Sequence, residues 1–224
     1  PAPFTDSIRG FELYEEFMNL GTGAGNNNWT TTLTGSASAA SLSGSANHPG
    51  VLALLSGTTA VSGFVLQQGS VNMLVGGGGL RCDIIINLEA LSDGAQTYTL
   101  RLGLGDSSTA DFTDGVYFEY DQTSTNNWRI CASQASTRTK TSTATAVAAA
   151  AYVRLTFIIN AGGTSVNFYV NGAETSGSPI SSNIPTGAGQ QTSPIIQFLK
   201  TVGTTSRYVA NDLFHIRQTF TTPR

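Results

Sequence analysis

The chain has 224 residues, a formal net charge of −3 and charged residues at only 11% of its positions, against roughly 25% in an average globular protein. Forty per cent of the residues are hydrophobic, which excludes a disordered chain, because such chains are usually charge-rich and poor in apolar residues. No run of lysine or arginine is present, so we expect no binding to nucleic acid. Weakly charged surfaces suit contacts with proteins or sugars, since few charges must be desolvated.

The first ten residues differ in composition from the rest of the chain. Residues 1–10 hold two prolines, a glycine and little to bury, so we interpret 1–10 as an N-terminal arm and 11–224 as a single domain. The sequence shows no secretory signal and no apolar run of membrane length, so we expect a protein made in a cytosol, with no membrane partner.

Short alternating apolar runs, separated by turn residues, begin early in the chain. Residues 11–20 fit a first strand better than a helix, because no capping residue precedes them. A turn is predicted at 47–50, where proline and glycine follow each other. The apolar run 51–59 predicts a buried strand, and we expect 61–69 to be its partner. The glycines of 76–79 lack the downstream lysine and Ser/Thr that a phosphate-binding loop needs.

Alternation is clearest in the middle and later parts of the chain. Residues 80–91 place apolar side chains on one face and polar ones on the other. The runs 153–159 and 166–170 predict a hairpin, because 160–165 collects residues that tolerate positive φ. The alanine-rich stretch 141–151 is interpreted as strand and turn, despite the helix preference of alanine.

These runs together predict roughly twelve short strands at hairpin spacing and no convincing helix. We therefore expect an all-β fold in which two antiparallel sheets form a sandwich or jelly roll.

Several stretches resemble one fold family. GVYFEYD (115–121), NNWRI (126–130) and FYVNG (168–172) resemble the concanavalin A-like (laminin G-like) jelly-roll domain, and the turns at 47–50 and 57–59 resemble its version in bacteriophage virion structural proteins. The resemblance runs from about Tyr14 to Arg217. One departure is Tyr152, where such domains often carry tryptophan.

The resemblance implies a lectin-like structural protein of the virion, located on the capsid surface and made in the host cytoplasm. Because a single jelly roll leaves no room for a fibre shaft, we expect a capsid decoration (cement) protein. Its partners would be the major capsid protein and copies of itself, with a trimer implied by the resemblance. The arm, 1–10, would contribute to docking. The alternative is a carbohydrate- or receptor-binding module of a tail fibre, with host glycans as partners.

Laminarinase-type glycosidases that resemble this fold carry Glu-x-Asp-x-Glu on one strand. Glu119 and Asp121 match the first two positions, but Thr123 stands at the third, and glycoside hydrolysis needs two carboxyl groups at a fixed separation. We therefore predict that the chain is not an enzyme, and we expect both carboxylates on a solvated outer strand face. A glycosidase or lyase is the third alternative, in which Glu119→Gln would abolish activity.

The remaining candidate residues receive structural interpretations. His48 and His215 lie far apart without a Gly-x-Ser-x-Gly elbow, so neither is assigned a catalytic role. Asp106, Asp111 and Asp114 surround one loop and are expected to cap turns, with calcium as an open alternative. We assign no catalytic, cofactor-binding or metal-binding residue.

Four aromatic residues are candidates for a sugar-stacking platform, although packing is the commoner fate of such side chains: Trp29, Trp128, Tyr117 and Tyr169. Cys82 and Cys131 each lie in an expected strand. We expect two buried free thiols, with a disulfide as the alternative.

Overall fold

The computed structural model describes residues 9–18 and 28–223. Within these ranges the regular elements are strands and no α-helix occurs, which confirms the all-β prediction. The strands are β1 (Gly10–Glu15), β2 (Trp29–Thr34), β3 (Ser38–Leu42), β4 (Val51–Leu55), β5 (Ser62–Gln68), β6 (Gly78–Leu88), β7 (Tyr98–Gly105), β8 (Gly115–Asp121), β9 (Asn127–Gln134), β10 (Thr137–Ala146), β11 (Tyr152–Ile159), β12 (Val166–Val170), β13 (Ala173–Glu174), β14 (Ser193–Lys200) and β15 (Tyr208–Phe220).

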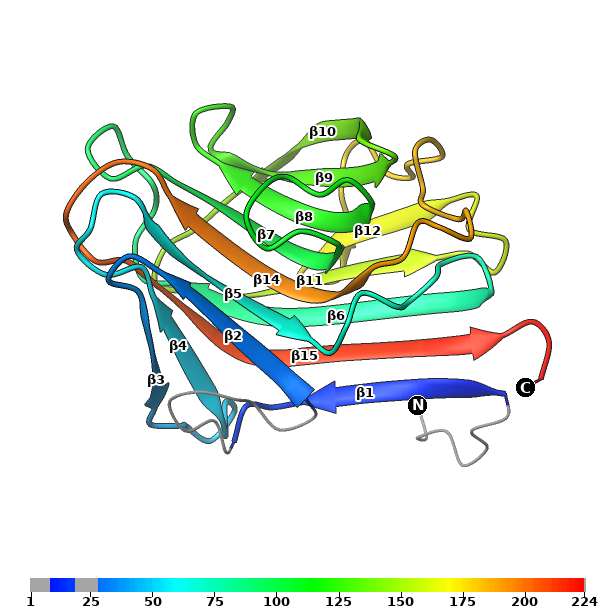
Figure 1. Cartoon of the computed structure of the whole chain (residues 1–224), viewed down its shortest axis with the longest axis horizontal. Coiled ribbons are helices and arrows are strands. Elements are labelled where there is room, and N and C mark those ends of the chain that lie inside the picture. The colour runs from blue at the N-terminus through cyan, green and yellow to red at the C-terminus, as the bar shows by residue number, and fades with distance from the viewer. Residues whose placement is uncertain (1–8, 19–27, 224) are drawn as a thin grey trace.

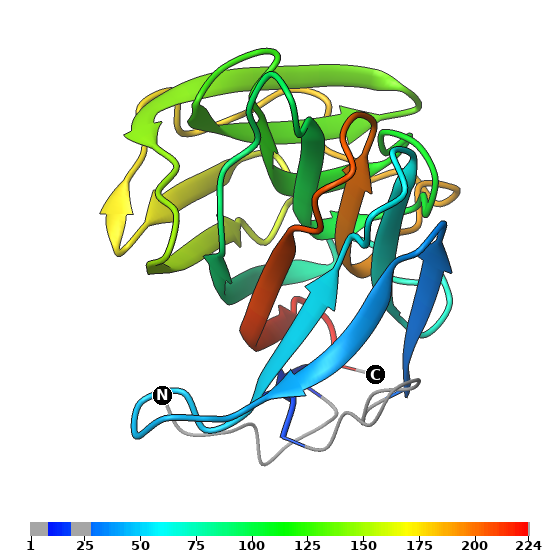
Figure 2. The same cartoon turned by 90° about the vertical axis from the view of Figure 1, so that its left-hand side faces the viewer.

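The strands form two antiparallel sheets that stack as layers (Figure 1). The eight-stranded sheet has the order β13-β12-β11-β6-β15-β4-β3, with β1 also paired to β15. The seven-stranded sheet has the order β10-β9-β8-β7-β14-β5-β2. Figure 2 views the molecule from the end where β2, β3 and β4 lie. The predicted two-sheet jelly-roll sandwich is confirmed.

The core lies between the two sheets and follows the predicted alternation. Leu155, Phe157 and Ile159 of β11 are fully buried, as are Val166 and Phe168 of β12. Burying such a side chain stabilises the fold by about 1.5–3 kcal/mol. The layer spacing is therefore set by apolar side chains that the sequence pattern identifies.

The turns also follow the sequence chemistry. Asn171 and Gly172, between β12 and β13, have φ angles of 51° and 83°, the left-handed region that Asn-Gly adopts in tight reversals. The hairpin between β11 and β12 contains Gly163 at φ 67°. The backbone N–H groups of Thr164 and Ser165 donate to the side-chain oxygen of Asn160, which fixes this reversal.

One predicted strand pairing is wrong. β4 pairs with β3 and β15 in the eight-stranded sheet, whereas β5 pairs with β14 and β2 in the seven-stranded sheet. The short connection between β4 and β5 therefore crosses from one layer to the other. The apolar run of β4 is buried along most of its length, and such a run does not reveal its partner.

The two cysteines are buried and free, as predicted. Cys82 belongs to the core between the sheets, whereas Cys131 lies in a separate apolar cluster with Phe112 and Tyr117. Burial raises the pKa of both thiols well above the usual value, so they behave as small apolar side chains.

The N-terminal arm lies largely outside the described residues. Residues 1–8 are not described, and Gly10 already pairs with Thr219 as the first residue of β1. In the described part of the chain, no helix has the length and hydropathy that a membrane crossing requires.

Candidate functional site

A row of polar and charged residues crosses the outer face of the seven-stranded sheet. The strand register places Gln197 of β14 beside Arg101 of β7, Arg101 beside Glu119 of β8, and Glu119 beside Arg129 of β9. Because side chains alternate along a strand, the neighbours of Glu119 in β8 point the other way, into the core. This row includes the first carboxylate of the Glu-x-Asp pattern.

Glu119 is surrounded by three cationic side chains. Its Oε2 accepts hydrogen bonds from Arg101 Nε at 2.8 Å and from Lys140 Nζ at 2.7 Å. Its Oε1 lies 3.0 Å from Arg129 Nη1. The residue is fully buried, so the expectation that Glu119 lies on a solvated surface is wrong, although the outward orientation was correct.

The cause is the loop between β7 and β8, residues 106–114, which folds back over this face. Asp111 lies 2.6 Å from Lys140 Nζ and 3.1 Å from Arg101 Nε. It also accepts a hydrogen bond from Tyr117 at 2.8 Å. The side-chain amide of Gln197 donates to the carbonyl groups of Ser107 and Ala110. The sheet and its covering loop are therefore joined by ion pairs and hydrogen bonds.

An aromatic side chain completes the cover. Phe112 is fully buried and its ring lies 4.7 Å from that of Tyr117, edge to face. A Cβ atom on Gly105 would stand 2.5 Å from the Phe112 ring, and one on Gly115 would stand 3.1 Å from it. The two glycines leave the space that Phe112 fills, so the loop seals this part of the sheet.

Asp121, the second residue of the pattern, has a different task. It is partly exposed, and its carboxylate accepts hydrogen bonds from Thr123 and Ser124 in the following turn. Hydrogen bonds of this kind stabilise turns. Glu119 and Asp121 therefore serve an ion-pair network and a turn, respectively, in this conformation.

The three loop aspartates are used separately. Asp106 accepts a hydrogen bond from the backbone N–H of Thr113, and Asp114 accepts one from the N–H of Ala135, both at 2.8 Å. Both roles match the expected capping of turns, whereas Asp111 joins the ion pairs. Over residues 9–18 and 28–223, no group of three or more His, Cys, Asp or Glu side chains is arranged to hold a metal ion.

Each histidine links two segments of the chain at the eight-stranded sheet. His48 Nδ1 lies 2.6 Å from Asp212 Oδ2, and its ring stacks on Tyr152 at 3.6 Å. His215 Nε2 lies 2.7 Å from Glu12 Oε1, which links β15 to β1. These contacts give both histidines a structural role. Tyr152, the departure from the family pattern, supplies the surface on which His48 rests.

The structure places three of the four candidate platform aromatics in the interior. Trp29, Trp128 and Tyr117 are 1%, 1% and 0% exposed, so they have no surface to offer a sugar ring. Tyr169 is partly exposed and lines a small pocket on the outer face of the eight-stranded sheet.

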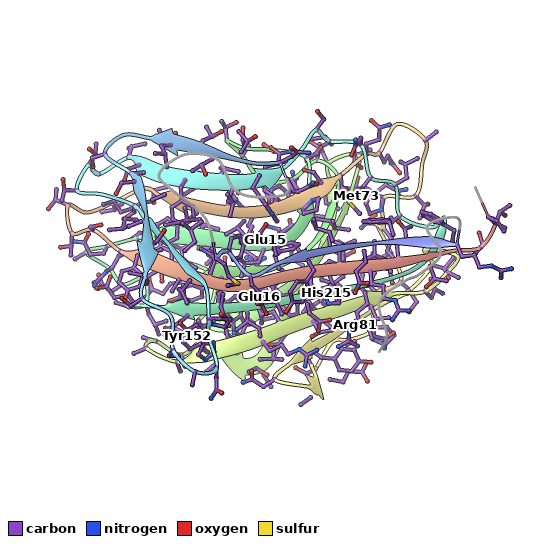
Figure 3. All side chains as sticks on the ribbon, turned by 90° about the horizontal axis from the view of Figure 1, so that it is seen from below. Glu15, Glu16, Met73, Arg81, Tyr152 and His215 are labelled. Carbon is purple, nitrogen blue, oxygen red and sulfur yellow. The ribbon has the colours of Figure 1, made fainter. Side chains whose placement is uncertain are left out.

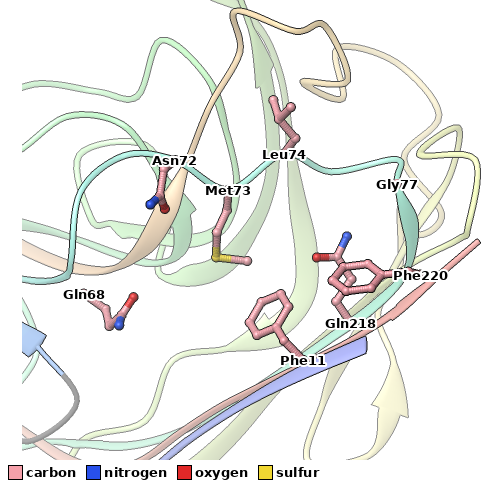
Figure 4. Close-up of a pocket in the computed structure, with 8 residues that line it drawn as sticks. All are labelled: Phe11, Gln68, Asn72, Met73, Leu74, Gly77, Gln218 and Phe220. Carbon is pink, nitrogen blue, oxygen red and sulfur yellow. The ribbon is translucent and has the colours of Figure 1, made fainter. Parts of the chain in front are cut away.

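An open pocket of about 520 Å³ lies elsewhere, beside the ends of β1 and β15. Its walls come from the first strand, the last strand and the connection between β5 and β6. The lining residues are Phe11, Gln68, Asn72, Met73, Leu74, Gly77, Gln218 and Phe220 (Figure 4).

The pocket, hereafter the edge pocket, combines aromatic, aliphatic and amide groups. The rings of Phe11 and Phe220 lie 6.4 Å apart, and Figure 4 shows the Met73 side chain directed toward Phe11. Met73 is held in place by two backbone hydrogen bonds with Thr192. Strand pairing places Phe11 beside Gln218. Apolar rings next to amide donors and acceptors suit a neutral polar ligand with apolar faces.

This pocket was not predicted from the sequence. Phe11 and Phe220 stand near opposite ends of the chain, and only the pairing of β1 with β15 brings them together. No motif of fixed spacing in the sequence predicts that these two rings meet. The one available signal is an aromatic residue within each terminal strand.

Comparison with solved structures supports the fold. The chain is similar to the protein SO2946 of unknown function from Shewanella oneidensis MR-1, with a TM-score of 0.71 and 16% identity over 100% of this chain and 92% of that one. An endo-1,3-beta-glucanase from Streptomyces sioyaensis gives a TM-score of 0.62 at 11% identity, over 98% and 100%. The carbohydrate esterase vb_24B_21 from the Shiga toxin-encoding bacteriophage phi24B gives 0.54 at 11% identity, over 85% and 90%.

The sequence also matches the model of one protein family. Residues 47–212 match the family model described as SO2946-like, C-terminal domain. No curated protein matches the chain. The match covers β4 to the first part of β15, including the covering loop and the ion-pair network.

Replacing Glu119 tests the structural role of the buried network. Glu119→Gln removes the negative charge that compensates Arg101 and Lys140, and breaking a buried ion pair destabilises a protein by about 3–5 kcal/mol. We expect a loss of this size in urea unfolding. The control is Glu89→Gln, because Glu89 is exposed and such a change alters stability by at most about 0.5 kcal/mol. Equal stability of the two variants would contradict the network's role.

The aspartates of the covering loop should make the stability of the protein depend on pH. Burial by itself would raise the pKa of Asp111, but Arg101 and Lys140 hold it below the usual 3.8. Its contribution to stability is therefore present above pH 3.8 and is lost as the pH falls further. Asp106 has the opposite sign, because burial raises its pKa. In urea unfolding from pH 7 to 3, Asp111→Asn should flatten the loss at acid pH and Asp106→Asn should steepen it; equal slopes would refute this assignment.

Proposed function

The chain belongs to the SO2946-like C-terminal domain family, and from its geometry we propose that it is a non-enzymatic carbohydrate-binding module. The observation that carries the proposal is the edge pocket, in which two phenylalanine rings and three side-chain amides line one opening. The ligand is a neutral glycan that enters this pocket.

The chemistry of the edge pocket matches that of a sugar. A sugar ring has apolar C–H faces and polar hydroxyl groups at its rim, so it needs flat apolar side chains beside hydrogen-bonding groups. Phe11 and Phe220 supply the former, whereas Gln68, Asn72 and the largely buried Gln218 supply the latter. The volume of about 520 Å³ falls within the range of about 300–1,000 Å³ typical of small-molecule sites.

The buried Glu119 supports the non-enzymatic part of the proposal. A catalytic carboxyl group must reach the scissile bond, together with a second carboxyl group at a fixed separation. Glu119 instead contacts three cations beneath the 106–114 loop. The solved glucanase and esterase are named as enzymes, and this chain shares their fold at 11% identity.

Removing one ring of the edge pocket tests the proposal. Phe220→Ala should abolish measurable binding of the cognate oligosaccharide by calorimetry, because half of the aromatic surface is lost. The probes are laminarihexaose and cellohexaose, and we expect a Kd between about 1 mM and 1 µM for at least one of them. The control is Leu33→Ala, since Leu33 is 46% exposed and does not line the edge pocket.

Three results would contradict the proposal. One is the absence of binding to either probe by the unmodified chain. Another is unchanged affinity in Phe220→Ala. The third is release of reducing ends from laminarin by the unmodified chain that disappears in Glu119→Gln.

A second candidate function is adhesion to a viral shell, as a capsid decoration protein. Within the described residues, β2 pairs only with β5 and β3 only with β4, so both are edge strands at the same end of the molecule (Figure 2). Their sequences, WTTTLT and SAASL, are largely exposed and uncharged. An edge strand presents backbone groups that pair readily with another chain. A bacteriophage origin, a capsid partner and a trimer stay predictions.

Light scattering and shell sedimentation test this second candidate. We expect a stable trimer that sediments with empty capsids, and weaker sedimentation after deletion of residues 1–8, a deletion that spares Gly10 and the whole of β1. A monomer that does not sediment with shells would contradict the adhesion function, while leaving glycan binding to its own test.

A further inference from the structure

The outer face of the eight-stranded sheet holds two arginines around one buried carboxylate. Asp83 of β6 accepts two hydrogen bonds from Arg81, at 2.6 and 2.9 Å, and two from Arg154 of β11, at 3.0 and 2.7 Å. Thr156 donates a fifth at 2.6 Å. Burial by itself would raise the pKa of Asp83, but these donors hold it below the usual value. Asp83 therefore stays ionised at neutral pH and fixes both guanidinium groups.

The cluster leaves positive charge at the surface. Two cations share one anion, so its net charge is +1. The side chains of Arg81 and Arg154 are 42% and 49% exposed, against 4% for Asp83. A guanidinium group has five N–H donors, and each arginine directs only two of them to Asp83. The remaining donors are available to a ligand.

A pocket of about 310 Å³ opens in front of these donors. Thr156 and Ile158 of β11 lie beside the two arginines, Tyr169 of β12 supplies an aromatic ring, and Gly172 closes the lining without a side chain. The pocket thus places a flat amphipathic ring and an aliphatic side chain next to two fixed cations. Figure 3 views this face and shows Arg81 across β1 and β15 from Met73 of the edge pocket.

We propose that this pocket is a second binding site, which takes an acidic saccharide through its carboxylate or sulfate group. A fixed guanidinium binds a planar oxyanion through two parallel hydrogen bonds, which a lysine does not reproduce. Tyr169 and Ile158 contact the attached sugar ring. Asp83 is a positioning residue, because it orients the arginines rather than touching the ligand.

The neighbouring charges are compatible with an anion. Arg217 of β15 lies beside Arg81 in the strand register, with Glu12 of β1 on its other side, so this pair adds no net negative charge to the face. Glu174 lies beside Tyr169 in the register, but its carboxylate accepts hydrogen bonds from Asn167 and Ser178. The acidic group closest to the arginines is the buried Asp83, whose charge they already exceed.

The second site does not depend on the edge pocket, since the two share no lining residue. Loss of neutral-glycan binding in Phe220→Ala would leave acidic-saccharide binding intact. Failure of one proposal is therefore distinguishable from failure of the other.

Calorimetry with three matched probes tests the second site. The probes are a short oligogalacturonate, a sulfated galacto-oligosaccharide and an unsubstituted galacto-oligosaccharide. We expect binding of at least one charged probe that weakens with added salt, and no binding of the neutral probe to this site. The stronger charged probe identifies the oxyanion as carboxylate or sulfate.

Variants of one arginine link that binding to the pocket. Arg154→Gln should weaken it about tenfold or more, because a charge-assisted bidentate contact is lost. Arg154→Lys, which keeps the charge but not the planar fork, should be intermediate and serves if the glutamine variant does not fold. Arg138→Gln, on the opposite face of the sandwich, is the control.

Two results would overturn the second site. One is equal binding of charged and neutral probes by Phe220→Ala, in which the edge pocket no longer binds neutral glycan, or binding of neither charged probe. The other is a charged-probe affinity that Arg154→Gln and Arg154→Lys leave at the level of the Arg138→Gln control.

Discussion

The ion pairs between Glu119 and the cations around it decide which face of the molecule is open to a ligand. Three positive side chains converge on this carboxylate, and Asp111 brings the 106–114 loop onto two of the same cations. Buried charges are tolerated only when they are paired and hydrogen-bonded. Because the network pairs them, this part of the outer face of the seven-stranded sheet is a packed interior rather than an open surface.

Because the 106–114 loop covers that face, the two proposed binding sites lie on other surfaces. The edge pocket carries rings and amides but no ionised side chain among its lining residues, whereas the pocket at Arg81 and Arg154 carries exposed positive charge. The two surfaces differ in chemistry and lie apart (Figure 3). A low overall charge is therefore compatible with a local excess of positive charge at Arg81 and Arg154.

The strands were predictable from sequence because their alternation reports directly which side chains face a core. Asn171 and Gly172 likewise predict a turn, because both residues tolerate the positive φ angles that it requires. The sheet membership of β4 and β5 was not predictable, since a run buried on both faces carries no information about its neighbours. Neither was the burial of Glu119, because it results from a loop that local alternation does not describe. Phe11 and Phe220 meet only through the pairing of the first and last strands.

The most direct test of glycan binding in the edge pocket is to map a bound neutral oligosaccharide by NMR on the isotopically labelled chain. We expect chemical-shift changes concentrated at Phe11, Met73, Gln218 and Phe220, with the 106–114 loop and the side chains around Glu119 unaffected. Changes concentrated instead at Asp111, Phe112 and Arg101 would show that the loop opens and that the binding site is the face around Glu119, not the edge pocket.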